Sequence, residues 1–297
     1  MSRGGPPWPG FIEPDQGQGD RRSHLFAPLR AEGAKGVTVA VASTLILLVV
    51  IVVIALHSSN WLVFKQAFFD GQLYWQSLRE IAPYFVRNIE WFLIAEPIIL
   101  VLALILAIMR SLPGPVFFPI RVMAIIYVDV FRGLPTILVI YLLGFGVPAL
   151  QIPGLPTQAA FWGIAGLILS YSAYVAEVYR AGIESIHPSQ TAAARSLGLS
   201  RLQTLRYVVV PQAVRRVIPP LLNDAIALQK DTAIISIVAG TLPEAFLYGQ
   251  ILQAATFNFT PILAVATFFL LITLPLTRFT DWLVARQRAQ RQSGAAL

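Results

Sequence analysis

The chain has 297 residues, of which 56% are hydrophobic and only 12% are charged. An ordinary soluble domain carries about 25% charged residues, so this composition indicates a membrane protein and excludes a typical soluble enzyme. The absence of cysteine excludes disulfides and thiolate catalysis. His24, His57 and His187 alone offer no histidine cluster, so we expect no metal site.

Six apolar runs are long enough to cross a bilayer, because a spanning helix needs about 20 mainly apolar residues at a rise of about 1.5 Å each. The runs cover residues 37–56, 85–109, 119–145, 161–179, 217–239 and 261–283. We therefore predict an all-α membrane protein with six transmembrane helices.

The segments around these runs differ in composition. Residues 1–36 are basic and rich in Gly and Pro, so they cannot bury enough apolar surface to order and should form a disordered cytoplasmic tail. The run at 37–56 begins too late and is too long for a cleaved signal peptide, which indicates a retained N-terminal transmembrane anchor. Residues 57–84 combine aromatic and charged side chains, as an amphipathic helix in the extracytoplasmic headgroup region does. We place the helical core at residues 85–285 and a cytoplasmic C-terminal tail at 286–297.

The distribution of Lys and Arg predicts the orientation. If the N-terminus is cytoplasmic, only Lys65, Arg79 and Arg87 of the 22 Lys and Arg fall in external loops. Arg132 and Lys230 lie within predicted spans, and the others face the cytoplasm, as the positive-inside rule requires. This topology accounts for the net charge of +7 without a basic face for nucleic acid, so we expect no nucleic-acid partner. Both termini are expected in the cytoplasm.

Residues 188–211 interrupt the apolar pattern with a polar, arginine-bearing stretch. It opens with a proline, and three consecutive alanines favour a helix. Gly198 suits the left-handed position that ends a helix, and Ser200 with Gln203 has the spacing of a capping box. We therefore predict a cytoplasmic helix-turn-helix whose second helix starts near Ser200 and stops before Pro211.

Three interpretations of this hairpin follow from the residues alone. Its arginines can simply obey the positive-inside rule in an interfacial loop. Alternatively, the small alanines let the backbone of another protein approach closely, with Leu197 and Leu199 as apolar anchors in a groove. A DNA-binding hairpin fits least, because it would lie against anionic headgroups with only a few basic residues.

Several ordered motifs resemble those of one known family. They are "YVDVFRGLP" at 127–135, "SAYVAEVYRAGIESI" at 172–186, "AARSLGLSR" at 193–201, "VVVPQAVRRVIPPLLND" at 208–224 and "QKDTAI" at 229–234. The chain resembles the membrane-spanning permease subunits of bacterial ATP-binding-cassette (ABC) importers, specifically the polar amino acid permeases. The resemblance covers about residues 85–285. It implies a five-helix permease core, preceded here by one extra N-terminal transmembrane helix.

The family's signature has the form Glu-Ala-Ala, three residues, Gly, nine residues, Ile-x-Leu-Pro. Ala193, Ala194, Gly198 and Pro211 take the corresponding positions, whereas Ala192 replaces the signature glutamate. By this resemblance the hairpin couples the permease to its ATPase. The implied coupling residues are Ala192, Ala193, Ala194, Arg195, Leu197, Gly198 and Leu199, with Pro211 in a gate or structural role. A paralogous permease that carries the standard glutamate could complete a heterodimer.

The resemblance also implies the partners. The sequence contains no G-x-x-x-x-G-K-[ST] loop, so ATP and Mg²⁺ should bind separate cytoplasmic ATPase subunits, and this chain should bind no cofactor and catalyse no reaction. An extracytoplasmic solute-binding protein should deliver the solute. Five core spans are too few to enclose a path, so a second permease copy, in a homodimer or heterodimer, should complete it within the lipid of the bacterial cytoplasmic membrane.

Five charged residues lie inside predicted spans, namely Glu96, Asp129, Arg132, Lys230 and Asp231. A charge at the centre of a membrane helix costs about 2.5–3.5 kcal/mol on insertion scales, so these side chains should face protein, water or one another. In a substrate pathway for an amino acid, Glu96 or Asp231 would meet the ammonium group and Arg132 the carboxylate. Alternatively, Asp129 pairs with Arg132 on one helical face, and Lys230 and Asp231 pair with neighbouring helices.

Other residues predict local structure. Glu177 and Arg180, three apart near the end of a span, should form an ion pair or brace a gate. His187 should cap the first hairpin helix or lie exposed beside it. Gly133 and Pro135 should break the third predicted span, and broken helices at membrane depth are tolerated where they line a cavity.

The leading prediction is a permease subunit of an ATP-driven importer that moves polar amino acids by alternating access. The same machine could carry another small solute such as a quaternary amine, in which case aromatic cages would matter more than Arg132. A secondary transporter or channel would leave the hairpin without a purpose, and no internal repeat supports it. A membrane enzyme has no supporting motif in this sequence.

Overall fold

The computed structural model describes residues 33–240 and 242–294. These residues are helical and include no strand, which confirms the all-α class. The α-helices are α2 (Gly33–Leu56), α3 (Trp61–Phe68), α4 (Gly71–Ser111), α5 (Phe118–Gly133), α6 (Thr136–Ala149), α7 (Ala159–Glu184), α8 (Pro188–Ser196), α9 (Arg201–Thr204), α10 (Val210–Asp231), α11 (Ala245–Thr256) and α12 (Thr260–Gly294). A π-helical turn, η1 (Leu205–Val209), joins α9 to α10, and a 3-10 helix, η2 (Thr232–Ile237), follows α10.

The chain divides into two compact units, residues 1–64 and 65–297. In the first unit, α2 agrees with the helix predicted at 37–56, and nearly all of its apolar side chains are exposed. A helix that is apolar on every side fits a lipid environment, since water would not solvate it. Residues 1–32 of the predicted basic tail lie outside the described residues.

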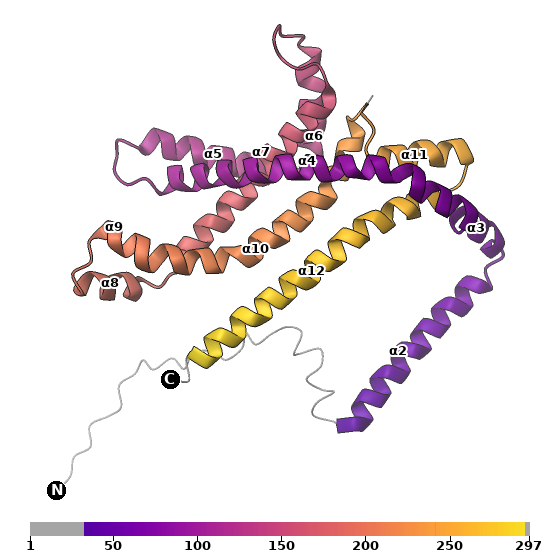
Figure 1. Ribbon diagram of the computed structural model, residues 1–297, viewed down its shortest axis with the longest axis horizontal. Helices are drawn as coiled ribbons and strands as arrows, with labels where there is room; N and C mark the ends of the chain where they lie inside the picture. Colours follow the sequence, from indigo (N-terminus) through magenta and orange to yellow (C-terminus); the bar gives the residue numbers. More distant parts are fainter. Residues whose placement is uncertain (1–32, 241, 295–297) are drawn as a thin grey trace. The chain divides into compact units, whose positions relative to one another are not determined.

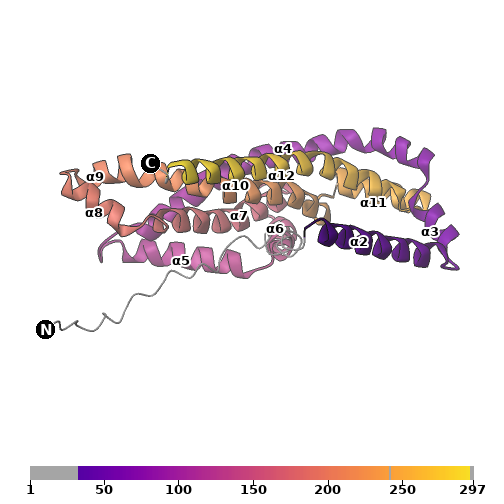
Figure 2. The ribbon, with the colours of Figure 1, turned by 90° about the horizontal axis from the view of Figure 1, so that it is seen from below.

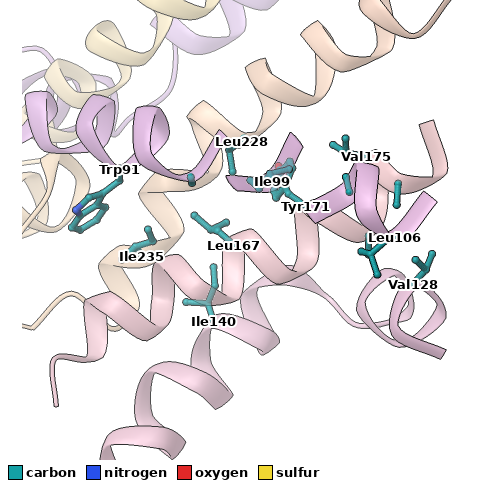
Figure 3. Close-up of a cluster of buried hydrophobic side chains, with 14 of the residues drawn as sticks. Trp91, Ile99, Leu106, Val128, Ile140, Leu167, Tyr171, Val175, Leu228 and Ile235 are labelled. Carbon is teal, nitrogen blue, oxygen red and sulfur yellow. The ribbon is translucent and has the colours of Figure 1, made fainter. Parts of the chain in front are cut away.

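In the second unit, α7 is the central helix and packs against α4, α5, α6 and α10. Ile99 of α4, Leu167 of α7 and Leu228 of α10 meet in the core, and each is at most 1% exposed (Figure 3). Helix α6 crosses the others steeply and is seen end-on in Figure 2. The crossing is close because α7 carries Gly166 there, where a Cβ would lie 3.1 Å from the Ile140 backbone.

The structure contains fewer straight spans than the six that the sequence predicts. Among the described residues, four segments are long and apolar enough to cross a membrane: Gly36–Ile54, Trp61–Ser111, Ala159–Glu184 and Thr260–Gln287. A fifth span is possible if α5 and α6 count together, but they meet at a 103° bend, which confirms the break predicted at Gly133 and Pro135. The predicted span 217–239 is divided between α10 and η2, and the charges of α10 interrupt its apolar sequence.

Helix α4 is longer than predicted. The sequence predicts a separate interfacial segment up to residue 84, whereas the structure continues one helix of 41 residues from Gly71 to Ser111. Asp70 caps its start by accepting a hydrogen bond from Leu73 N, and Pro83 and Pro97 lie inside the helix without ending it. At about 1.5 Å per residue the helix is about 60 Å long, twice the thickness of the hydrocarbon core, so part of it must protrude or tilt strongly.

The helix-turn-helix is present, but its second arm continues beyond the predicted stop. Gly198 adopts the predicted left-handed conformation with a φ of +86°, and Ser200 and Gln203 form the predicted capping box. The prediction that the helix stops before Pro211 is wrong. The π-helical turn η1 precedes this proline, and Val210 N bonds to Leu205 O, so the missing N–H falls in the first turn of α10.

Candidate functional site

Residues 188–209, comprising α8, α9 and η1, form a polar hairpin at one end of the second unit. Figure 1 and Figure 2 both show α8 and α9 at the end of the helices opposite to α11. Leu197 is 84% exposed and Leu202 is 74% exposed, and Leu205 and Tyr207 are exposed as well. Several exposed apolar side chains on one short element are typical of a protein interaction surface.

The predicted coupling residues lie together on this hairpin. Ala192, Ala193, Arg195, Leu197 and Gly198 are exposed. Leu199 is half-buried, whereas Ala194 is buried and packs toward the protein. The exposed part of the predicted set is thus available to a partner, whereas Ala194 is not.

The base of the hairpin is well fixed. His187 is the N-cap of α8 and accepts a hydrogen bond from Ser189 N at 3.2 Å, which confirms its predicted capping role. Ile186, Val209 and Ala213 form a small buried cluster beneath the hairpin. Both arms are therefore anchored where they join α7 and α10.

An acidic cluster, which we define as Glu96, Asp224 and Asp231 with Tyr171, lies where α4, α7 and α10 meet. Tyr171 donates a hydrogen bond to Asp231 Oδ2 at 2.8 Å. Glu96 and Asp224 lie close enough to interact electrostatically, and so do Asp224 and Tyr171. Asp224 Oδ2 is buried without a hydrogen-bond partner among the described residues. Lys230 acts electrostatically on Asp231, but none of the three carboxylates forms an ion pair among the described residues. Clustered carboxylates inside a membrane protein favour binding of a cationic group.

Sequence reasoning identified Glu96 and Asp231 in this cluster but missed Asp224. The missed signal was its position seven residues before Asp231, which is two helical turns and so the same face of α10. Asp129 and Lys230, also predicted in the pathway, are exposed on the surface of the unit, and their role in the pathway stays a prediction. The proposed pairing of Asp129 with Arg132 is not among the ion pairs of the described residues.

Arg132 lies beside Glu177. Its Nη1 is 3.8 Å from Glu177 Oε2, and its guanidinium group lies 6.0 Å from the centroid of the Tyr174 ring. Glu177 also pairs with Arg180, which confirms the predicted ion pair, and with Arg110 of α4 at 2.8 Å. The sequence did not indicate the Arg110 contact, because Arg110 and Glu177 are 67 residues apart.

A second buried polar network was also missed. Asn88 of α4 donates to Thr232 Oγ1 at 3.1 Å and to Glu244 Oε2 at 2.9 Å, and it accepts from Ala245 N at 3.1 Å. Burial raises the pKa of the Glu244 carboxyl, while hydrogen bonds from Phe246, Asn88 and Leu247 act in the opposite direction. The network therefore fixes Thr232, the residue that follows Asp231 in the chain.

Comparison with known proteins identifies the fold and its class. Residues 98–289 match the family of binding-protein-dependent transport system inner membrane components. The chain belongs to this family. It is therefore a multi-pass inner-membrane subunit of a transport system, and the resemblance to ABC importer permeases is confirmed.

Individual relatives agree with this assignment. The probable glutamine ABC transporter permease protein GlnM of Bacillus subtilis (strain 168) is 33% identical over 187 residues, which cover 63% of this chain and 83% of GlnM. The glutamine transport system permease protein GlnP of Escherichia coli (strain K12) is 34% identical over 155 residues, which cover 52% of this chain and 69% of GlnP. The crystal structure of an amino acid ABC transporter with histidines has a TM-score of 0.63 and 30% identity, covering 71% of this chain and 97% of that chain.

Proposed function

We propose that this chain is the permease subunit of an ABC importer that moves polar amino acids across the cytoplasmic membrane by alternating access. The observation that carries the proposal is the polar hairpin with exposed Leu197 and Leu202 at one end of a membrane-spanning family member. The hairpin and both termini face the cytoplasm. There the hairpin binds in a groove of a separate ATPase subunit, and that subunit binds ATP and Mg²⁺.

The acidic cluster supports the solute class. The ammonium group of an amino acid meets the carboxylates of Asp231, Asp224 and Glu96. Among the described residues none of the three forms an ion pair, although Lys230 acts electrostatically on Asp231. Arg132 can take the solute carboxylate, because its contact with Glu177 at 3.8 Å leaves guanidinium donors free for a bidentate bond. The named functions of the similar proteins GlnM and GlnP favour a polar side chain on the solute.

The exposed charges support a second permease copy. Asp129 and Lys230 are exposed on this chain, yet a charged side chain in contact with lipid is costly. A second copy, identical or paralogous, covers them and completes the pathway between the two chains. An extracytoplasmic solute-binding protein delivers the solute to the end opposite the hairpin.

Reconstitution in proteoliposomes tests the proposal. The permease, a candidate ATPase and a candidate solute-binding protein are incorporated, and uptake of labelled acidic, basic and amide amino acids is followed with and without ATP on the hairpin side. We expect uptake of at least one of these solutes only with ATP. Uptake driven by an ion gradient without any ATPase would show a secondary transporter, and uptake of quaternary amines alone would show a different solute class.

A further inference from the structure

One carboxylate joins three helices beside the polar hairpin. Glu177 of α7 accepts a hydrogen bond from Arg110 Nη1 of α4 at 2.8 Å and lies 3.8 Å from Arg132 Nη1 of α5. It also pairs with Arg180 on its own helix. The Glu177 side chain is only 22% exposed, so solvent screens these contacts less than it screens a surface ion pair. Three guanidinium groups therefore meet at one half-buried negative charge.

The hairpin end of α7 is in close contact with the start of α10. Arg216 of α10 donates a hydrogen bond to the backbone oxygen of Ser185, just beyond the end of α7. A side chain at Gly182 would overlap Val217, so α7 and α10 are in close contact there. Because α7 leads into the hairpin and α10 leads out of it, a force on the hairpin displaces both helix ends together.

Glu177 lies two turns, about 10 Å, before the end of α7. From there it reaches the bend between α5 and α6, because Arg132 directly precedes Gly133 at the 103° turn. Tyr174 reinforces the contact, since its hydroxyl lies 3.4 Å from the backbone oxygen of Arg132. Helix α7 thus contacts the end of α5 at two places: Glu177 faces the Arg132 side chain, and Tyr174 faces the Arg132 backbone.

The same helix continues to the acidic cluster. Tyr171, one turn beyond Tyr174, donates its hydroxyl to Asp231. Along α7 the order is therefore hairpin, Glu177, the α5–α6 bend and the acidic cluster. A displacement at one end of this series has a continuous set of contacts through which to reach the other end.

We propose that Glu177 is a positioning residue that transmits movement of the hairpin to α4 and to the α5–α6 bend, and so links ATP hydrolysis on the partner to opening of the pathway. The inference rests on the proposed function. Packed helices shift as rigid bodies, and Glu177 makes α4, α5 and α7 shift together. Without its negative charge, Arg110 and Arg132 lose their partner and repel each other and Arg180. Movement of the hairpin then no longer displaces the bend between α5 and α6.

The test compares Glu177→Gln with Glu184→Gln in the reconstituted importer. Gln has nearly the shape of Glu but no charge. Glu184 is a matched control because it also pairs with Arg180, yet its side chain is 61% exposed. We expect Glu177→Gln to keep ATP hydrolysis and thermal stability while solute moved per ATP falls about tenfold, a change in the usual range of coupling energies. Glu184→Gln should keep the wild-type ratio, and Glu177→Asp, which retains the charge, should restore part of it.

Other results would overturn the inference. An unchanged ratio in Glu177→Gln shows that the carboxylate transmits nothing. A parallel loss of hydrolysis, uptake and thermal stability shows a purely structural role. If Glu177→Gln does not fold, Arg110→Gln replaces it as the test, because it removes the contact of Glu177 with α4 at a residue that has no assigned contact with the solute. A lower ratio of solute moved per ATP at saturating solute supports transmission, whereas an unchanged ratio overturns the proposal.

Uptake by the wild-type importer distinguishes a failure of the proposed function from a failure of the role given to Glu177. ATP-dependent uptake by the wild type establishes the proposed function whatever the variants do. Absence of that uptake refutes the proposed function itself.

Discussion

Replacing Asn88 with alanine removes the side chain that ties α4 to η2 and α11. Three hydrogen bonds are lost, those to Thr232 Oγ1, to Glu244 Oε2 and from Ala245 N. Asn88, Thr232 and Glu244 are each 0% exposed, so water does not replace the missing bonds without opening the structure. The cost therefore includes groups left buried without a partner.

The magnitude follows from the kinds of bond. Values from soluble proteins, about 1 kcal/mol for each neutral bond and about 2 kcal/mol for the bond to a carboxylate, give about 4 kcal/mol. Side-chain hydrogen bonds measured within a membrane protein average about 0.6 kcal/mol, which gives a lower figure of about 2 kcal/mol. We expect Asn88→Ala to lower the free energy of unfolding by about 2–4 kcal/mol.

Denaturant titration of the purified protein in detergent micelles, followed by circular dichroism, measures this difference. Gln76→Ala on the same helix is the matched control, because Gln76 is exposed and its bond to Glu80 is replaced by water. The control should change the free energy of unfolding by less than about 0.5 kcal/mol. A loss in Asn88→Ala no greater than in the control would refute the reasoning that this buried network stabilises the fold.

Three further predictions concern the hairpin, the acidic cluster and helix packing. Gly198→Trp has space, since nothing lies within 4 Å of a Cβ at this position, but it strains the left-handed backbone; it should distort the hairpin locally and uncouple ATP hydrolysis from uptake while the helices stay folded, and undiminished transport would count against the hairpin's role. Tyr171→Phe removes the donor to Asp231 and should raise the half-saturating solute concentration with little change in thermal stability; an unchanged uptake curve would exclude Asp231 from the pathway. Gly182→Leu should lower the free energy of unfolding by about 1–3 kcal/mol, because the new side chain overlaps Val217, and thermal denaturation that matches the wild type would contradict this.

Local features were predictable from short stretches of sequence. The break at Gly133 and Pro135, the left-handed Gly198 and the capping box of Ser200 with Gln203 each depend on residues within one helical turn. The stop predicted at Pro211 was the exception, since a π-helical turn before the proline supplies the space that an α-helix would lack.

The candidate site was predictable only in part. Glu96 and Asp231 could be singled out because charge is rare in apolar runs, whereas nothing in the sequence joins Glu177 to Arg110 or Asn88 to Glu244. These pairs come from segments far apart in the chain, and they meet only because α4 packs against both α7 and α11.

By itself, the sequence determined that this protein is helical, that it belongs in a membrane, that it has a polar hairpin and that it resembles importer permeases. These properties depend on apolar length, charge and residues close in the chain. Only the tertiary structure decided which charges meet. It joined Glu177 to Arg110 and Arg132 and left Asp224, among the described residues, without a hydrogen-bond partner at one buried oxygen, because such contacts depend on how distant helices pack against α7.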